Sequence, residues 1–373
     1  MKINKLYYFG GLAICVSSAL VSHTKLPIPP ALLIWGITVL LFLFLYLSDF
    51  GSSRMPKYGL IVLPFAFFLM FTQPFTGASV KNYVGPIIST LFFPLVVYFL
   101  SYLNRNQIIR IVKYLLIIST IVLTFETLYR YVFPNFDVQD ISEGRGTDDV
   151  FYMFKSSSLM YNDSNATGIH ILLVLFFTYY WSEFVNEKYA LIKIVLWLLL
   201  ILTISRAAWI GAIVGLIYFK LLRGKPILFW IFLGSLLFLF CLIVFFAYLL
   251  PLMETDPSFM ARIEVFESAF KYYKSGPNII DQLNGIGVYM SQVYFDIYLH
   301  NFYIVQAVEM GFISLALLFI MWGQFIYYTK SKALIILVPY SIVILSSTLS
   351  FIPVFYIVFG IICICENKLK NTV

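Results

Sequence analysis

The sequence predicts an all-α, polytopic integral membrane protein, with about 12 transmembrane helices in a single membrane domain, residues 1–373. The chain is 61% hydrophobic and only 12% charged, about half the charged fraction of an average soluble domain. Apolar runs of about 17 residues or more recur along its length, and runs of that length can cross a bilayer as helices. The alternating segments of about ten residues that are typical of transmembrane barrels do not appear.

The apolar runs predict spans at 6–23, 30–47, 58–73, 83–103, 108–133, 165–181, 189–204, 206–222, 226–250, 300–328, 333–348 and 350–366. Few residues separate 189–204 from 206–222, or 333–348 from 350–366, so each pair is predicted to be a tight hairpin. No small-residue cleavage site follows the first run, so we expect a retained helix rather than a signal peptide.

The basic residues are unevenly distributed between the two sides of these predicted spans. Lysines and arginines occur in every second loop, for example at Lys5, Arg54, Arg105, Lys220 and Lys330, whereas most acidic residues fall in the other set of loops. By the positive-inside rule this pattern places both termini in the cytoplasm. The net charge of +7 is therefore explained by topology, and it does not indicate a nucleic-acid partner.

Two loops on the outer side are much longer than the others, 134–165 and 251–299. Long loops in a compact protein are commonly functional or disordered. Because both lie on the same predicted side, we expect any chemistry to take place outside the cytoplasm.

The second long loop is predicted to contain an amphipathic helix between Asp256-Pro257 and Gly276-Pro277. An acidic N-cap followed by proline favours a helix start, and Gly-Pro favours its end. One apolar stripe is expected at helical spacing: Phe259, Ile263, Phe266, Phe270 and Tyr273. Such a helix would lie along the membrane surface. Arg262 is at the edge of the stripe, where it is either a snorkelling arginine or a phosphate ligand.

Further candidates follow this helix. Gly285 and Gly287 are one residue apart, which allows a sharp turn or a close backbone approach. His300-Asn301 joins the loop to the span 300–328; an imidazole there can accept a proton from a hydroxyl or merely satisfy the interface. Glu309 is predicted to be an intramembrane carboxylate, a functional candidate by default, unless it only pairs within the bundle.

The remaining candidates are earlier in the chain. Arg206 follows Ser205 in the outer turn of a hairpin, where positive charge is uncommon, so it is a candidate diphosphate ligand. Arg130 and Glu126 are four residues apart on one predicted helix and are expected to pair. Asn165 belongs to a polar helix start in which neighbouring residues could simply act as caps.

In this order, these motifs resemble those of the O-antigen polymerase and O-antigen ligase superfamily. The resemblance rests on a Ser-Arg turn at 205–206, Arg262 on a loop helix, Gly-x-Gly at 285–287, and His300-Asn301 followed after nine residues by Gly311. The helix start at Asn165 is also similar. By motif the resemblance covers about residues 160–315, and by topology the whole chain. In the superfamily, the glycine of the His-Asn…Gly pattern is followed by a small or aromatic residue, and Ser314 matches that position only loosely.

The resemblance implies a GT-C-like fold and a metal-independent glycosyltransferase without a cofactor, in the bacterial inner membrane, with a periplasmic active site. The donor and acceptor would be undecaprenyl-diphosphate-linked oligosaccharides. Arg206 and Arg262 would hold the diphosphate, and His300 would be the general base. The supporting candidates are Asn301, Gly285, Gly287, Glu309, Arg130 and Asn165. Expected partners are membrane lipid, a chain-length regulator and a flippase.

Three functions remain open, and a polymerase that joins repeat units on lipid carriers is preferred. An O-antigen ligase, which transfers the finished glycan to lipid A-core, would carry the same motifs. A flippase or transporter of lipid-linked glycans would need polar residues deep in several helices, which are almost purely apolar in this chain.

Overall fold

The computed structural model describes residues 2–20, 29–48, 55–135, 153–154, 157–161, 164–222, 257–295, 299–347 and 351–369, and within these ranges it contains helices and loops but no strand. The helices of the first part are α1 (Lys2–Ser17), α2 (Pro30–Ser48), α3 (Leu63–Thr72), α4 (Val80–Ser101), α5 (Arg105–Val132), α8 (Ser164–Val185), α9 (Ala190–Leu202) and α10 (Arg206–Ile217). The second part contains α13 (Pro257–Lys274), α14 (Ile279–Asn284), α15 (Ser291–Phe295), α16 (Phe302–Glu309), α17 (Gly311–Tyr328), α18 (Leu334–Val343) and α19 (Pro353–Ile364). Short turns extend several helices, among them η3 (Gln73–Phe75) and η6 (Ile344–Ser346).

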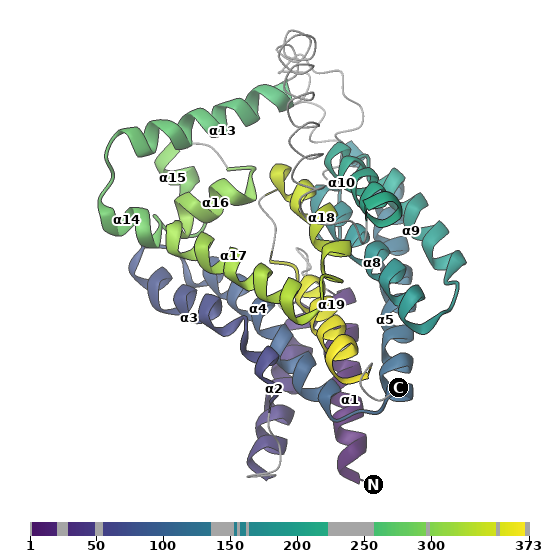
Figure 1. The fold of residues 1–373 in the computed structure, drawn as a ribbon. Coiled ribbons are helices and arrows are strands. Elements are labelled where there is room, and N and C mark those ends of the chain that lie inside the picture. The colour runs from purple at the N-terminus through teal and green to yellow at the C-terminus, as the bar shows by residue number, and fades with distance from the viewer. Residues whose placement is uncertain are drawn as a thin grey trace.

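The core of the bundle is formed by α4, α8 and α19 (Figure 1). Every residue of α19 is buried, and α8 is buried along most of its length. Gly360 lets α19 approach α4 closely, since a Cβ atom there would lie 3.0 Å from a methyl group of Val96. By contrast, only 17% of the apolar window in α2 is buried, which is expected of a helix that faces lipid.

Six of the described helical segments are long and apolar enough to cross a membrane: Pro30–Ser48, Lys57–Phe75, Val80–Ser101, Arg105–Val132, Ser164–Val185 and Gly311–Tyr328. Two shorter apolar segments are Ala190–Leu202 and Leu334–Ser346. These findings agree with a polytopic membrane protein. The number of twelve spans and the GT-C-like fold stay predictions, and the predicted span 226–250 lies outside the described residues.

The single span predicted at 300–328 is wrong, because the structure divides it into two helices. Helix α16 ends at Glu309, and α17 begins at Gly311. Gly311 has a φ of +84°, which breaks the helical path and is readily adopted by glycine. Glu309 is therefore at the end of a short helix rather than inside a continuous span.

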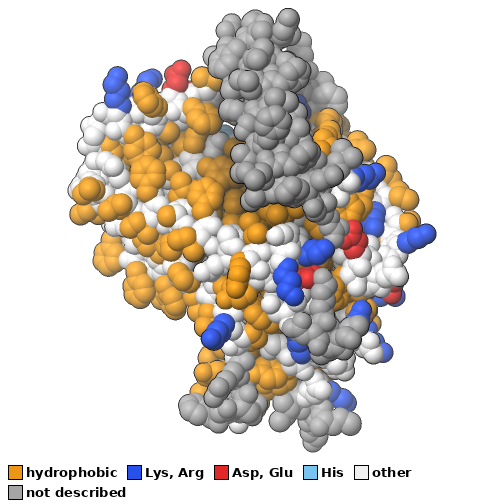
Figure 2. Space-filling model, in the orientation of Figure 1, with side chains coloured by type: hydrophobic (Ala, Val, Ile, Leu, Met, Phe, Trp, Pro, Cys, Tyr) orange, Lys and Arg blue, Asp and Glu red, His pale blue; other side chains and the backbone are white. Residues whose placement is uncertain are grey.

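Helices α13 to α16 lie together at the end of the molecule away from the N-terminus (Figure 1). The predicted amphipathic helix is present as α13, but its buried face differs from the predicted stripe. Phe266 and Phe270 are 57% and 69% exposed, whereas Val265 and Ala269 are buried and pack in one cluster with residues of α16. Thus α13 has apolar residues on two faces. Hydrophobic side chains also cover much of the surface over α14 to α17 (Figure 2).

Candidate active site

The turn between α9 and α10 presents Arg206 at the first position of α10, where its side chain is exposed. Ser205 is the N-cap, and its Oγ accepts a hydrogen bond from the Ala208 N–H at 3.3 Å. Thr203 Oγ1 donates to the Leu200 carbonyl at 2.7 Å. Ile204 has a φ of +53°, an uncommon conformation for a β-branched residue. Local hydrogen bonds therefore fix the residues that precede Arg206.

The start of α8 lies directly beside this turn. Ser205 Oγ donates to Asn165 Oδ1 at 2.6 Å. Gly168 provides the space for this contact, because a Cβ atom there would lie 2.7 Å from the Cβ of Ala208. Asn165, a supporting candidate in the sequence, is thus tied to the cap of the helix that carries Arg206.

A buried polar network joins α5 to α8 near this position. Arg130 Nε donates to Glu126 Oε1 at 3.0 Å, and the Arg130 guanidinium also donates to Ser158 and Thr167. The second carboxylate oxygen of Glu126 accepts hydrogen bonds from the backbone N–H groups of residues 159 and 160, each at 3.0 Å. The predicted Glu126–Arg130 pair is confirmed. Glu126 therefore has two roles: it pairs with Arg130 on α5, and it holds the end of the first long loop through residues 159 and 160.

His300 directly precedes the N-cap of α16, and its side chain is exposed. Asn301 is the N-cap of this helix, and its Oδ1 accepts hydrogen bonds from the N–H groups of Tyr303 at 3.1 Å and Ile304 at 3.2 Å. Such caps satisfy backbone donors that the first helical turn leaves unpaired. The asparagine therefore fixes the start of α16, and with it the backbone position of His300.

The glycine pair at 285 and 287 contacts the other end of α16. Gly285 and Gly287 have φ values of +84° and +110°. The N–H of Gly287 donates to the Glu309 carbonyl at 2.9 Å, and that of Ile286 donates to the Val308 carbonyl at 3.0 Å. The sequence allowed either a turn or a close backbone approach at these glycines, and both occur. The chain turns here, and its backbone is hydrogen-bonded to the end of α16.

The Glu309 side chain completes this junction. It is 3% exposed, and Oε2 accepts a hydrogen bond from the Tyr289 N–H at 2.8 Å. Oε1 accepts from the N–H of Ser291 at 3.4 Å and from its hydroxyl. Of the two interpretations of Glu309, the structure supports a carboxylate that pairs with neighbouring groups and holds the start of α15 against α16.

Helix α10, which begins at Arg206, and helix α16, which follows His300, both contact one further element. Helix α18 packs against α10, and Gly211 faces the Pro339 carbonyl, 2.9 Å from where a Cβ atom would lie. The η6 turn at the end of α18 contacts both α10 and α16, and Tyr303 Oη donates to the Ser341 carbonyl at 3.3 Å. The α18–η6 segment is thus a structural link between the two candidate regions.

Arg262 lies in the first half of α13, and its side chain is outside the described part of the chain. The helix itself packs against α16, where Val265 and Ala269 form an apolar cluster with Leu299, Val305 and Val308. The backbone of Arg262 is thus carried by a helix that contacts the His300 helix.

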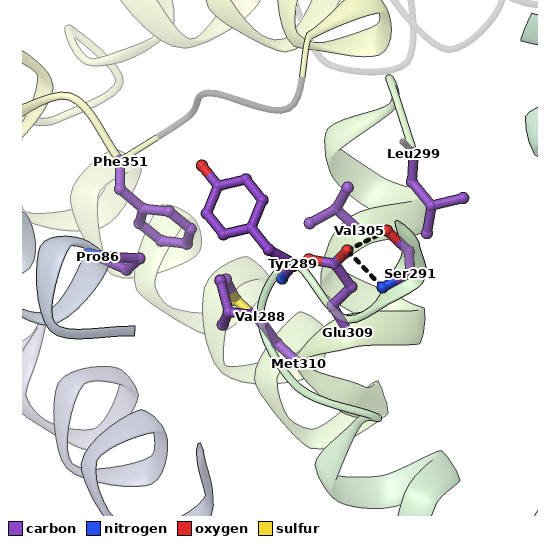
Figure 3. A pocket seen from close by; sticks show the side chains of 9 residues that line it. All are labelled: Pro86, Val288, Tyr289, Ser291, Leu299, Val305, Glu309, Met310 and Phe351. Atoms are coloured by element: carbon purple, nitrogen blue, oxygen red, sulfur yellow. Dashed lines mark hydrogen bonds between the residues drawn. The ribbon is translucent and has the colours of Figure 1, made fainter. Parts of the chain in front are cut away.

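A small cavity lies between α4, the 288–291 loop, α16 and the start of α19 (Figure 3). It is lined by Tyr289, Ser291, Glu309, Leu299, Val305 and Phe351, among others. Leu299 immediately precedes His300, so one lining residue of the cavity is the chain neighbour of the candidate base. Its wall combines apolar and aromatic surface with one buried carboxylate.

Residues 191–320 match the family model described as O-antigen ligase. Over these residues the chain is similar to the O-antigen polymerase and ligase superfamily. The match confirms the resemblance deduced from the motifs, and it includes Arg206, Arg262 and His300. No curated protein sequence matches the chain.

Several residues that contact the candidate site residues were not identified from the sequence. Tyr289 and Ser291 follow the Gly-x-Gly motif, and only their proximity to it could have drawn attention to them. Ser158 and Thr167 bind Arg130 from positions far along the chain. No sequence spacing predicts those contacts, since they depend on how α5 and α8 pack.

Proposed function

We propose that the protein is a polymerase of O-antigen or a related surface polysaccharide. It joins oligosaccharide repeat units carried on undecaprenyl diphosphate at the periplasmic face of the bacterial inner membrane. The similarity of residues 191–320 to the superfamily supports glycan transfer in general. The observation that carries the proposed site is the shared η6 contact: helix α10, which begins at Arg206, and helix α16, which follows His300, both pack against this turn.

In this reaction His300 accepts the proton of an acceptor sugar hydroxyl as that oxygen attacks the anomeric carbon of the donor. A new glycosidic bond forms, and the bond between the anomeric carbon and the phosphate oxygen breaks. The diphosphate leaves with the electron pair, and the positive charges of Arg206 and Arg262 stabilise it. In this proposal arginine, rather than a metal ion, supplies the charge.

Contacts in the structure support a positioning role for four of the other candidates. Asn301 caps the helix behind His300, and Asn165 binds the cap residue before Arg206. Gly285 and Gly287 allow the loop to contact the end of α16. In this proposal these four residues position His300, Arg206 and the loop, without contacting the substrate themselves.

The alternative function is that of an O-antigen ligase, and the description of the matching family model favours it. Deletion of the gene separates the two functions. Loss of a polymerase leaves lipid A-core that carries a single repeat unit. Loss of a ligase leaves bare core while lipid-linked polymer accumulates. A surface polysaccharide of normal length and amount in the deletion strain would contradict both.

A further inference from the structure

Tyr289 has an unusual backbone conformation for its residue type. Its φ is +63°, in the left-handed region that glycine and asparagine adopt readily and bulky residues avoid. It directly follows a segment with two glycines, so another glycine here would suit the turn at lower conformational cost. Backbone outliers of this kind concentrate at functional sites.

Hydrogen bonds hold Tyr289 in this conformation. The buried Glu309 carboxylate accepts its N–H at 2.8 Å, and the same carboxylate binds Ser291 two residues later. The turn is closed by the N–H of Met290, which donates to the Gly287 carbonyl at 3.1 Å. The end of α16 therefore fixes the backbone at Tyr289.

The Tyr289 ring projects into the cavity that Leu299, the residue before His300, also lines (Figure 3). It extends between Phe351 on one side and Val305 with Leu299 on the other. The residue is 41% exposed, so the ring forms part of the accessible wall rather than of the core. Leu299 immediately precedes His300 in the chain, so this wall and the candidate base are joined through the backbone of one short segment.

The chemistry of this wall fits a saccharide. A tyrosine ring provides a rigid surface that is apolar over its face and polar at its tip, and a sugar ring has an apolar face edged by hydroxyl groups. The buried carboxylate of Glu309 disfavours an anionic ligand such as a diphosphate, because like charges repel strongly where water is excluded. The exposed face of the Tyr289 ring at this cavity is thus suited to the sugar of the acceptor.

We propose that Tyr289 is a specificity-determining residue whose ring stacks on the acceptor sugar and holds its hydroxyl beside His300. This inference rests on the proposed glycosyltransferase function, since it assigns the acceptor subsite of that reaction.

The test measures binding without catalysis. The probe is the repeat-unit oligosaccharide released from the strain's own polysaccharide, free of lipid and diphosphate, added to the full-length protein in nanodiscs. Saturation-transfer NMR reports which sugar protons contact the protein. Tyr289→Gly and Tyr289→Asn remove the ring but keep residues that adopt the left-handed conformation, so both are expected to fold with an unchanged or higher Tm. Tyr289→Phe keeps the ring.

Both ring-deleting variants should weaken saccharide binding at least tenfold, whereas Tyr289→Phe should change it less than threefold. Asn186→Gly is the matched control, because Asn186 also has a positive φ, of +57°, in a different loop; its binding should equal that of the unaltered protein. Equal saccharide binding by folded Tyr289→Gly or Tyr289→Asn would overturn the proposal, as would displacement of the bound probe by a short polyprenol. His300→Ala separates this proposal from the proposed function: the stacking role requires that this variant still binds the probe, whether or not the protein forms polymer.

Discussion

Gly285 and Gly311 lie so close that neither position has room for a side chain. A Cβ atom on Gly285 would lie 2.2 Å from the Glu309 carbonyl oxygen and 2.6 Å from the Gly311 nitrogen. One on Gly311 would lie 2.1 Å from the Leu283 carbonyl oxygen. The Gly-x-Gly motif and the glycine after His-Asn are thus two sides of one backbone contact, which locks the loop onto the end of α16.

Gly311→Ala should therefore destabilise the protein by more than backbone strain alone. A left-handed alanine costs about 1–2 kcal/mol, and here backbone atoms must also separate. Gly276→Ala is the control, since Gly276 has a φ of +71° but no atom within 4 Å of a Cβ position. Thermal unfolding in detergent measures both. Equal losses of Tm in the two variants would show that the close contact contributes nothing.

The sequence predicted this junction only in part. Paired glycines indicated a close approach, but their partner at the end of α16 depends on tertiary packing. A continuous apolar run likewise hid the break at Gly311, because glycine within an apolar segment is compatible with an unbroken helix. The buried face of α13 was missed for a related reason: a helix between protein and lipid has apolar residues on both faces, so hydrophobicity alone does not identify the packed one.

Local patterns were more informative. The i, i+4 spacing predicted the Glu126–Arg130 pair, and the Asp-Pro and Gly-Pro signals gave the extent of α13 closely. The hairpin of α9 and α10 followed from the short polar turn at 203–205. These features depend on neighbours in the chain, whereas the Asn165–Ser205 and Glu309–Tyr289 contacts depend on the arrangement of helices.

Glu126→Ala should strongly destabilise the bundle. It leaves the Arg130 guanidinium buried without its carboxylate, and breaking a buried ion pair in this way costs about 3–5 kcal/mol. The double variant Glu126→Ala plus Arg130→Ala should lose clearly less than the sum of the single losses. Lys113→Ala changes an exposed charge on the same helix and should shift stability by about 0.5 kcal/mol or less. Additive losses in chemical unfolding would contradict a coupled pair.

Ser205→Ala should impair use of the donor more than it impairs folding. It removes both the cap of α10 and the bond to Asn165, at a cost of about 1–2 kcal/mol, and frees the turn before Arg206. Steady-state kinetics should show a higher KM for the lipid-linked donor, restored by Ser205→Thr. Asn104→Ala removes the equivalent cap of α5 and should leave that KM unchanged. A normal donor KM in folded Ser205→Ala would argue against this positioning role.

Arg206→Ala and Arg262→Ala should each weaken use of the diphosphate donor, about tenfold or more if each loses one charge-assisted contact of roughly 1.5–3 kcal/mol. Arg206→Lys should restore only part of the activity, because lysine lacks the planar guanidinium. Arg110→Ala, on the outside of α5, is the control. Donor turnover by either purified alanine variant at the normal rate would remove that arginine from the diphosphate site.

The role of His300 is tested most directly with the purified protein and its lipid-diphosphate-linked repeat unit. Product length on a gel should show long polymer for the unaltered protein and none for His300→Ala, while the variant remains inserted and unfolds at a similar temperature. His170→Ala, which alters a buried histidine of α8, controls for general effects of histidine loss once its folding is verified. Polymer of normal length and rate from His300→Ala would contradict general-base catalysis by His300.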